Sequence, residues 1–254
     1  MSTETPYVRI ERAEGIGSIE FFHPQSNSMP GAQLARLAEA FDELGADPSV
    51  RVIVLRSAGE RAFCGGASFD ELAAIADDAQ GLAFFSGFAR VILAMRRCPQ
   101  FVVAVVQGRC VGGGVGLAAS ADYCLALQTA SVKLSELAVG IGPFVVGPAV
   151  ERKVGVSGFS ELAIDAASWR DAEWARSRGL FNALLATRDE LEAEAERLTR
   201  SLNQSNPEAM SALKKALWFG TDHWETLLYE RAAISGRLVL SDFTRQAIAR
   251  FKAS

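Results

Sequence analysis

Three short apolar runs, each followed by a loop and then a helical pattern, constrain the fold of this chain more than any other feature. They occupy residues 52–55, 101–106 and 123–127, and aliphatic side chains dominate all three. Runs of this length and composition are typical of strands that are buried on both faces, as in parallel sheets. Because strand, loop and helix alternate, we predict an α/β fold with functional residues in the loops at the strand ends.

Helical patterns separate and follow these strands. Apolar residues recur at steps of three and four in residues 33–45, which predicts a helix. Ser68 and Glu71 have the spacing of a capping box and open a second helix, and residues 82–96 form a third. From about residue 190 the strand pattern stops, and three more helices are predicted at residues 191–202, 208–217 and 224–238. We expect this helical C-terminal region to pack against the α/β part.

Composition excludes several classes of function. The chain has 254 residues, 26 Lys and Arg against 30 Asp and Glu, and a net charge of -4, so it offers no basic surface for a nucleic acid. No apolar run approaches the roughly 18 residues that a membrane helix needs, and the charged N-terminus does not resemble a signal peptide. Four cysteines and two histidines show no ligand spacing, so no metal site is expected. We therefore expect a cytoplasmic protein with neither a membrane nor a nucleic acid as its partner.

Two glycine-bearing loops carry the strongest chemical signal. Residues 62–71 and the triplet Gly112-Gly113-Gly114 each lead from a strand into a helix. Small residues let a ligand approach the backbone, and the first N–H groups of a helix have no partner within the helix. Two such loops facing one point would form an oxyanion hole, in which one donor typically contributes roughly 2.7–4 kcal/mol to the stability of a transition state.

Each loop taken alone has other interpretations, since glycine-rich turns between strands and helices are ordinary packing devices. The spacing Gly114-x-Gly116-x-x-Ala119 also fits a loose dinucleotide-binding pattern, with Glu136 about twenty residues later. The preceding strand ends too early for that motif, near residue 106, and no Gly-Lys-Ser or Gly-Lys-Thr follows for a phosphate-binding loop.

Five motifs taken together, in their order along the chain, resemble the enoyl-CoA hydratase/isomerase family of the crotonase superfamily. They are residues 62–71, residues 106–108 leading to the glycine triplet, Ala121-Asp122, Ser135-Glu136-Leu137 with Gly140 and Pro143, and residues 172–182 followed by Asn206-Pro207 and Lys214. The resemblance spans nearly the whole chain.

The resemblance implies a fold and an assembly. Residues 1–190 would form a spiral of repeated ββα units that holds an acyl-CoA site. Residues 191–254 would form a helical region that assembles homotrimers, often paired into hexamers. The substrate would be an acyl-CoA thioester, and no cofactor beyond its CoA group is implied.

The same resemblance implies roles for particular residues. The backbone N–H groups of Ala67 and Gly113 would hold the thioester oxygen, and Glu136 would be the catalytic acid or base. Hydratases of the family use two glutamates, and the position of the first falls on Gly116 in this chain. Substrate binding is assigned to residues around these groups, with Cys64 packing beneath the pocket: Cys64, Gly65, Gly66, Ser68, Gly112, Pro143 and Phe144. Arg61 and Lys252 are the candidate cations for the CoA phosphates.

One carboxylate beside an oxyanion hole is enough to move a proton between two carbons. We therefore predict double-bond isomerisation of an enoyl-CoA, with hydration and decarboxylation of an acyl-CoA as alternatives on the same fold. An alternative of another class is a protein without catalysis, which would bind acyl-CoA or act as an assembly subunit. The acidic net charge argues against the RNA binding seen in one branch of the family.

Overall fold

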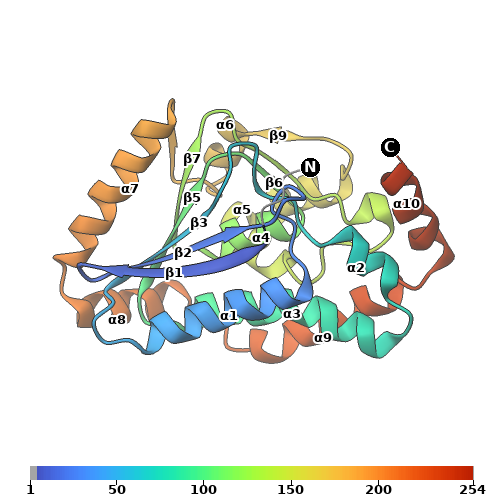
Figure 1. Cartoon of the computed structure of the whole chain (residues 1–254), viewed down its shortest axis with the longest axis horizontal. Helices are drawn as coiled ribbons and strands as arrows, with labels where there is room; N and C mark the ends of the chain where they lie inside the picture. The colour runs from blue at the N-terminus through green and yellow to red at the C-terminus, as the bar shows by residue number, and fades with distance from the viewer. Residues whose placement is uncertain (1–4, 254) are drawn as a thin grey trace.

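The chain folds around two sheets, which the computed structural model describes within residues 5–253, with side chains placed through residue 250 (Figure 1). The larger sheet has the order β1 (Tyr7–Ala13), β2 (Ile16–Phe22), β3 (Val52–Ser57), β5 (Phe101–Val106), β7 (Tyr123–Leu127) and β10 (Ala183–Leu185). The smaller sheet has the order β4 (Ala62–Cys64), β6 (Arg109–Val111), β8 (Ser131–Lys133) and β9 (Arg170–Asp171). From β2 to β10 the neighbours in the larger sheet are parallel, as predicted.

Successive ββα units link the two sheets. In each unit the first strand joins the larger sheet, the second joins the smaller sheet, and a helix follows. The units are β3–β4 with α2 (Phe69–Ala74), β5–β6 with α4 (Gly113–Ser120), and β7–β8 with α5 (Gly147–Ile164). The expected α/β fold of repeated ββα units is therefore confirmed.

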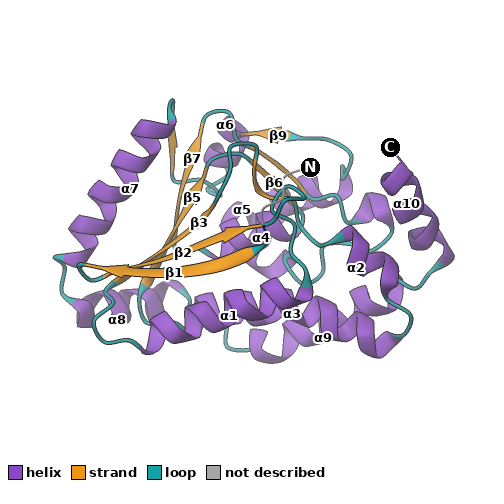
Figure 2. Ribbon diagram, viewed as in Figure 1, coloured by secondary structure: helices purple, strands orange, loops and turns teal. Residues whose placement is uncertain are grey.

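Helices cover both faces of the larger sheet (Figure 2). Alternate residues of its strands point to opposite sides, so apolar side chains of one strand pack against both helical layers. Ile53 and Leu55 face a core that includes α1 (Gly31–Ala46) and α3 (Asp78–Arg97). Val52 and Val54 face a second core against α7 (Arg188–Asn203). This two-sided burial explains why the strands read as continuous apolar runs.

The C-terminal helices pack onto the α/β part. They are α8 (Pro207–Leu217), α9 (Trp224–Leu238) and α10 (Asp242–Ala253), and α9 lies along α3. The backbones of α3 and α9 approach closely, since a Cβ on Gly81 would lie 2.5 Å from the Gly236 carbonyl oxygen. The predicted helices at residues 191–202, 208–217 and 224–238 are confirmed, whereas their role in assembly stays a prediction. Within the described residues, none of the helices combines the length and apolarity needed to cross a membrane.

Candidate active site

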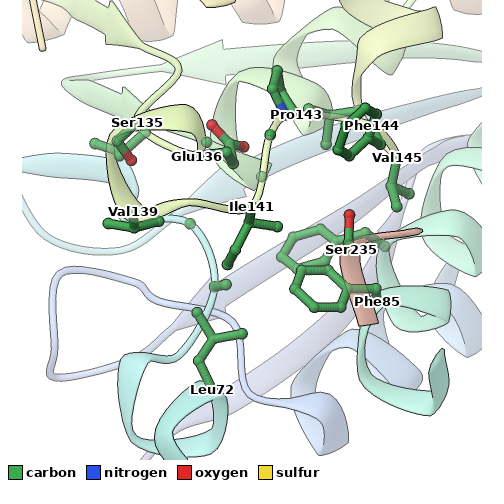
Figure 3. A pocket seen from close by; sticks show the side chains of 18 of the residues that line it. Leu72, Phe85, Ser135, Glu136, Val139, Ile141, Pro143, Phe144, Val145 and Ser235 are labelled. Carbon is green, nitrogen blue, oxygen red and sulfur yellow. The ribbon is translucent and has the colours of Figure 1, made fainter. Parts of the chain in front are cut away.

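A mostly apolar cavity lies where three strands of the smaller sheet end. Residues 65–67 follow β4, residues 112–113 follow β6, and residues 135–136 follow β8. The empty space amounts to about 560 Å³, its open mouth included. Apolar side chains from α2, α3 and the segment after Glu136 form most of the other walls: Leu72, Phe85, Phe88, Val139, Ile141, Phe144, Val145 and Val146 (Figure 3).

The two predicted N–H donors border this cavity. Hydrogen bonds from Met29 N to Gly66 O (2.7 Å) and from Ser68 N to Met29 O (3.3 Å) hold the first loop on either side of Ala67. Among the described residues, no protein acceptor receives the N–H of Ala67 or of Gly113. Both groups are therefore free to bind an oxygen atom of a ligand.

Glycine is required for the contact between the two loops. Gly66 has a φ of +87°, and a Cβ there would lie 2.8 Å from Val111 O and 3.6 Å from Gly113 N. A Cβ on Gly113 would lie 2.1 Å from the Phe88 ring, and one on Gly114 would lie 2.4 Å from Cys64 O. Side chains at Gly66 and Gly114 would separate the two loops and with them the two donors, and a side chain at Gly113 would clash with Phe88 of α3.

Glu136 faces the second loop. Its Oε1 lies 2.9 Å from where a Cβ of Gly112 would be, and its buried Oε2 has no hydrogen-bond partner within the described chain. Hydrogen bonds from Val139 N (3.2 Å) and Ile141 N (2.9 Å) to the Glu136 carbonyl oxygen fix the turn that carries it. Because burial disfavours the charged form, the pKa of Glu136 is raised to about 7. A carboxylate with this pKa exchanges protons readily at neutral pH.

Five of the remaining predicted residues line the cavity together with the donors and Glu136. They are Gly65, Gly66, Gly112, Pro143 and Phe144.

Cys64 and Ser68 do not line the cavity, and their part in substrate binding stays a prediction. The fully buried Cys64 Sγ accepts a hydrogen bond from Gly66 N (3.4 Å), which supports the loop from below. The Ser68 hydroxyl accepts one from Glu71 N (3.4 Å) and caps α2. The exposed Arg61 is not part of the lining either, and the side chain of Lys252 lies outside the described residues.

Comparisons with known proteins agree with this geometry. Residues 11–244 match the sequence profile of the enoyl-CoA hydratase/isomerase family. The chain belongs to this family.

Individual relatives cover most of the chain. A probable enoyl-CoA hydratase of Mycobacterium bovis is 29% identical over 247 residues, which are 95% of this chain and 93% of the relative. A mevalonyl-coenzyme A hydratase of Beauveria bassiana is 33% identical over 207 residues, or 77% of this chain and 72% of the relative. The crystal structure of an enoyl-CoA hydratase from Bacillus halodurans has the same fold, with a TM-score of 0.88, 20% identity and coverage of 96% and 99% of the two chains. This protein is thus an acyl-CoA enzyme of the enoyl-CoA hydratase/isomerase family.

Gly116 is where the chain departs from the two-glutamate pattern of the family's hydratases, and the space beside it is filled. A Cβ on Gly116 would lie 2.4 Å from Val146 Cγ1 and 2.7 Å from Val146 Cβ. Val146 is buried and lines the cavity. A glutamate could not be placed at position 116 unless Val146 moved.

We expect Gly116→Ala to destabilise the protein by about 1–3 kcal/mol, because the added methyl group overpacks the contact with Val146. Urea denaturation would measure the change. In a Val146→Gly background the same substitution should cost less than about 0.5 kcal/mol, since the clash has been removed. Equal costs in the two backgrounds would contradict this explanation.

Several lining residues were missed in the sequence, among them Leu72, Phe85, Phe88 and Ser235. These four come from α2, α3 and α9, and the sequence pattern marks the first three only as apolar positions on helices. Ser235 has no local signal, because only the docking of α9 against α3 brings it to the cavity.

Proposed function

We propose that this enzyme shifts the double bond of an enoyl-CoA, with Glu136 as its acid and base. The Glu136 carboxylate removes a proton from C2 of a 3-enoyl thioester, and the C–H electron pair delocalises into the thioester as a dienolate. The N–H groups of Ala67 and Gly113 stabilise the negative oxygen. Glu136 then returns the proton to C4, which yields the 2-enoyl thioester and regenerates the carboxylate.

One observation carries this proposal. Among the described residues that line the cavity, Glu136 supplies the only carboxylate, and none of the described residues pairs with its Oε2. Asp70 and Glu71 serve elsewhere, since Asp70 accepts a hydrogen bond from Gln25 and Glu71 accepts one from Gly31 N. A single group that both removes and returns a proton suits isomerisation, which consumes no water.

Hydration is the second candidate, favoured by the names of the two relatives compared above. In that reaction Glu136 would have to direct the water molecule and transfer its protons without the first glutamate. The packing of Val146 against Gly116 makes hydration the less favoured candidate.

The test is to incubate the protein with 3-enoyl-CoA, 2-enoyl-CoA, saturated acyl-CoA and carboxylated acyl-CoA esters in heavy water and to analyse the products by mass spectrometry. Isomerisation is expected, with deuterium incorporated at C2 or C4. Addition of water would favour hydration, and loss of carbon dioxide from a carboxylated ester would favour decarboxylation. Binding of esters that all remain unchanged would favour the non-catalytic alternative and overturn the proposal.

The rate should also depend on pH in a defined direction. Proton removal requires the carboxylate form of Glu136, whose pKa is about 7. We therefore expect kcat/KM to fall about tenfold per pH unit well below 7 and to level off above it. An initial-rate profile between pH 5 and 9 would check this, and a profile that is flat through pH 7 would contradict the role of Glu136.

A further inference from the structure

Ser235 places a hydroxyl group in the apolar part of the cavity. Its side chain lies on α9, only 2% of the residue is exposed, and the hydroxyl points into the cavity on the side where Val145 and Phe144 lie (Figure 3). No atom in the described part of the chain forms a hydrogen bond with this hydroxyl group. The Ser235 hydroxyl is therefore open to the cavity and has no partner among the described residues.

Two other buried helical hydroxyl groups of this chain, those of Ser120 and Thr199, are satisfied by their own helices. Ser120 Oγ donates to Gly116 O, and Thr199 Oγ1 donates to Ala195 O, both at 2.8 Å. Burying a hydroxyl group without a partner is unfavourable, so an unpaired one facing a cavity is a candidate ligand contact.

The position of Ser235 is fixed and lies away from the oxyanion loops. The next residue, Gly236, is in backbone contact with Gly81 of α3, whereas Phe88 of the same helix contacts Gly113. Seven residues of a helix span about 10 Å, so Ser235 lies roughly that far along α3 from the thioester position. A group that reaches Ser235 must belong to the distal part of the acyl chain.

The cavity offers few other polar groups. Its polar side chains are Ser135, Glu136 and Ser235, and the first two share one loop. Only Ser235 comes from a helix, α9. Apolar walls around a single hydroxyl group favour a largely hydrocarbon chain that bears one hydrogen-bonding atom.

We infer that the natural acyl group carries an oxygen substituent, a hydroxyl or carbonyl group, on its distal part, where it hydrogen-bonds to Ser235. This inference rests on the proposed binding of an acyl-CoA thioester by Ala67 and Gly113. Ser235 is thereby a specificity-determining residue, and it takes no part in the proton transfer.

Calorimetric titration with paired esters tests this inference without turnover. The pairs are saturated four-, six- and eight-carbon acyl-CoA esters and their terminally hydroxylated counterparts. For the best-fitting length, the hydroxylated ester should bind about tenfold more tightly than its partner, as expected for one well-placed hydrogen bond. The preference should disappear in Ser235→Ala, mainly through weaker binding of the hydroxylated ester.

Ser86→Ala is the matched control. Ser86 is a buried helical serine of α3 without a hydrogen bond in the described structure, and it does not line the cavity. This variant should retain the tenfold preference, since only the loss of a hydroxyl group inside the cavity affects ligand choice.

The outcomes separate this inference from the proposed function. Equal affinities within every pair for the unmodified protein, or a preference that Ser235→Ala retains, would overturn the inference while isomerisation in heavy water stood. A preference that depends on Ser235 in a protein that transfers no proton would support the inference and overturn the catalytic proposal. Failure of every ester to bind would overturn both.

Discussion

Glu136→Gln is expected to slow proton transfer by about a thousandfold while acyl-CoA affinity stays within a few-fold. Glutamine has nearly the same shape, yet it cannot accept a proton, and general acid–base catalysis typically contributes 10²–10⁴-fold. The N–H groups of Ala67 and Gly113 belong to the backbone, so this substitution leaves them in place. Deuterium incorporation and calorimetric affinity, measured on the same preparation, would check both halves of the prediction.

The stability of this variant supplies an independent control. The pKa of Glu136 is raised from 4.5 to about 7 in the folded protein, so folding favours the protonated form. This contribution is fully present below pH 4.5 and is lost as pH rises through 7. Relative to the unmodified protein, Glu136→Gln should gain less than about 1 kcal/mol in unfolding free energy at pH 5 and about 3 kcal/mol at pH 8.5. A gain independent of pH would show that the carboxyl group is not buried as described.

Lys214→Met is expected to lower the free energy of unfolding by about 3–5 kcal/mol. The buried Lys214 Nζ lies 3.0 Å from Asp122 Oδ2 and donates to Met95 O (2.8 Å) and Gln100 O (2.7 Å). Removing the ammonium group leaves the buried Asp122 carboxylate without its counter-charge and takes one donor from each of the two carbonyl groups. Urea denaturation would measure the loss.

An exposed ion pair provides the comparison. Glu196 and Arg200 lie on the surface of α7, with side chains 58% and 66% exposed. Glu196→Gln should change stability by less than about 0.5 kcal/mol, because exposed pairs contribute little. Similar losses for Lys214→Met and Glu196→Gln would show that burial does not govern the strength of the Asp122 pair.

The sequence predicted the elements whose patterns are strong and missed those whose patterns are interrupted. The strand at residues 101–106 and the helix at residues 224–238 have the predicted bounds, because continuous burial and regular spacing mark them. α5 was missed, since it contains three glycines and Pro148 and has non-helical backbone at Gly155. The β1–β2 hairpin was missed because β1 is a charged, largely accessible edge strand without a clear apolar pattern. The alternation in β2 alone did not mark a hairpin.

The site was predictable where it depends on the backbone. Local composition pointed to the two glycine-bearing loops, whereas the roles of Ala67, Gly113 and Glu136 needed the family resemblance. The wall formed by Phe85, Phe88 and Ser235 could not be predicted, because its members are far apart in sequence and meet only through helix packing. The sequence thus predicted the groups proposed for the reaction, but not the side chains of this wall.

The use of main-chain donors bears on how this protein can evolve. Mutation replaces side chains and leaves every N–H group in place unless proline is introduced, so the N–H groups that we propose as oxyanion donors persist through most substitutions. The cavity walls are side chains on α2, α3 and α9 and in the segment after Glu136, and they can vary one residue at a time. Substitutions in the walls can therefore change the preferred substrate while the backbone donors, and the reaction that they support, stay the same.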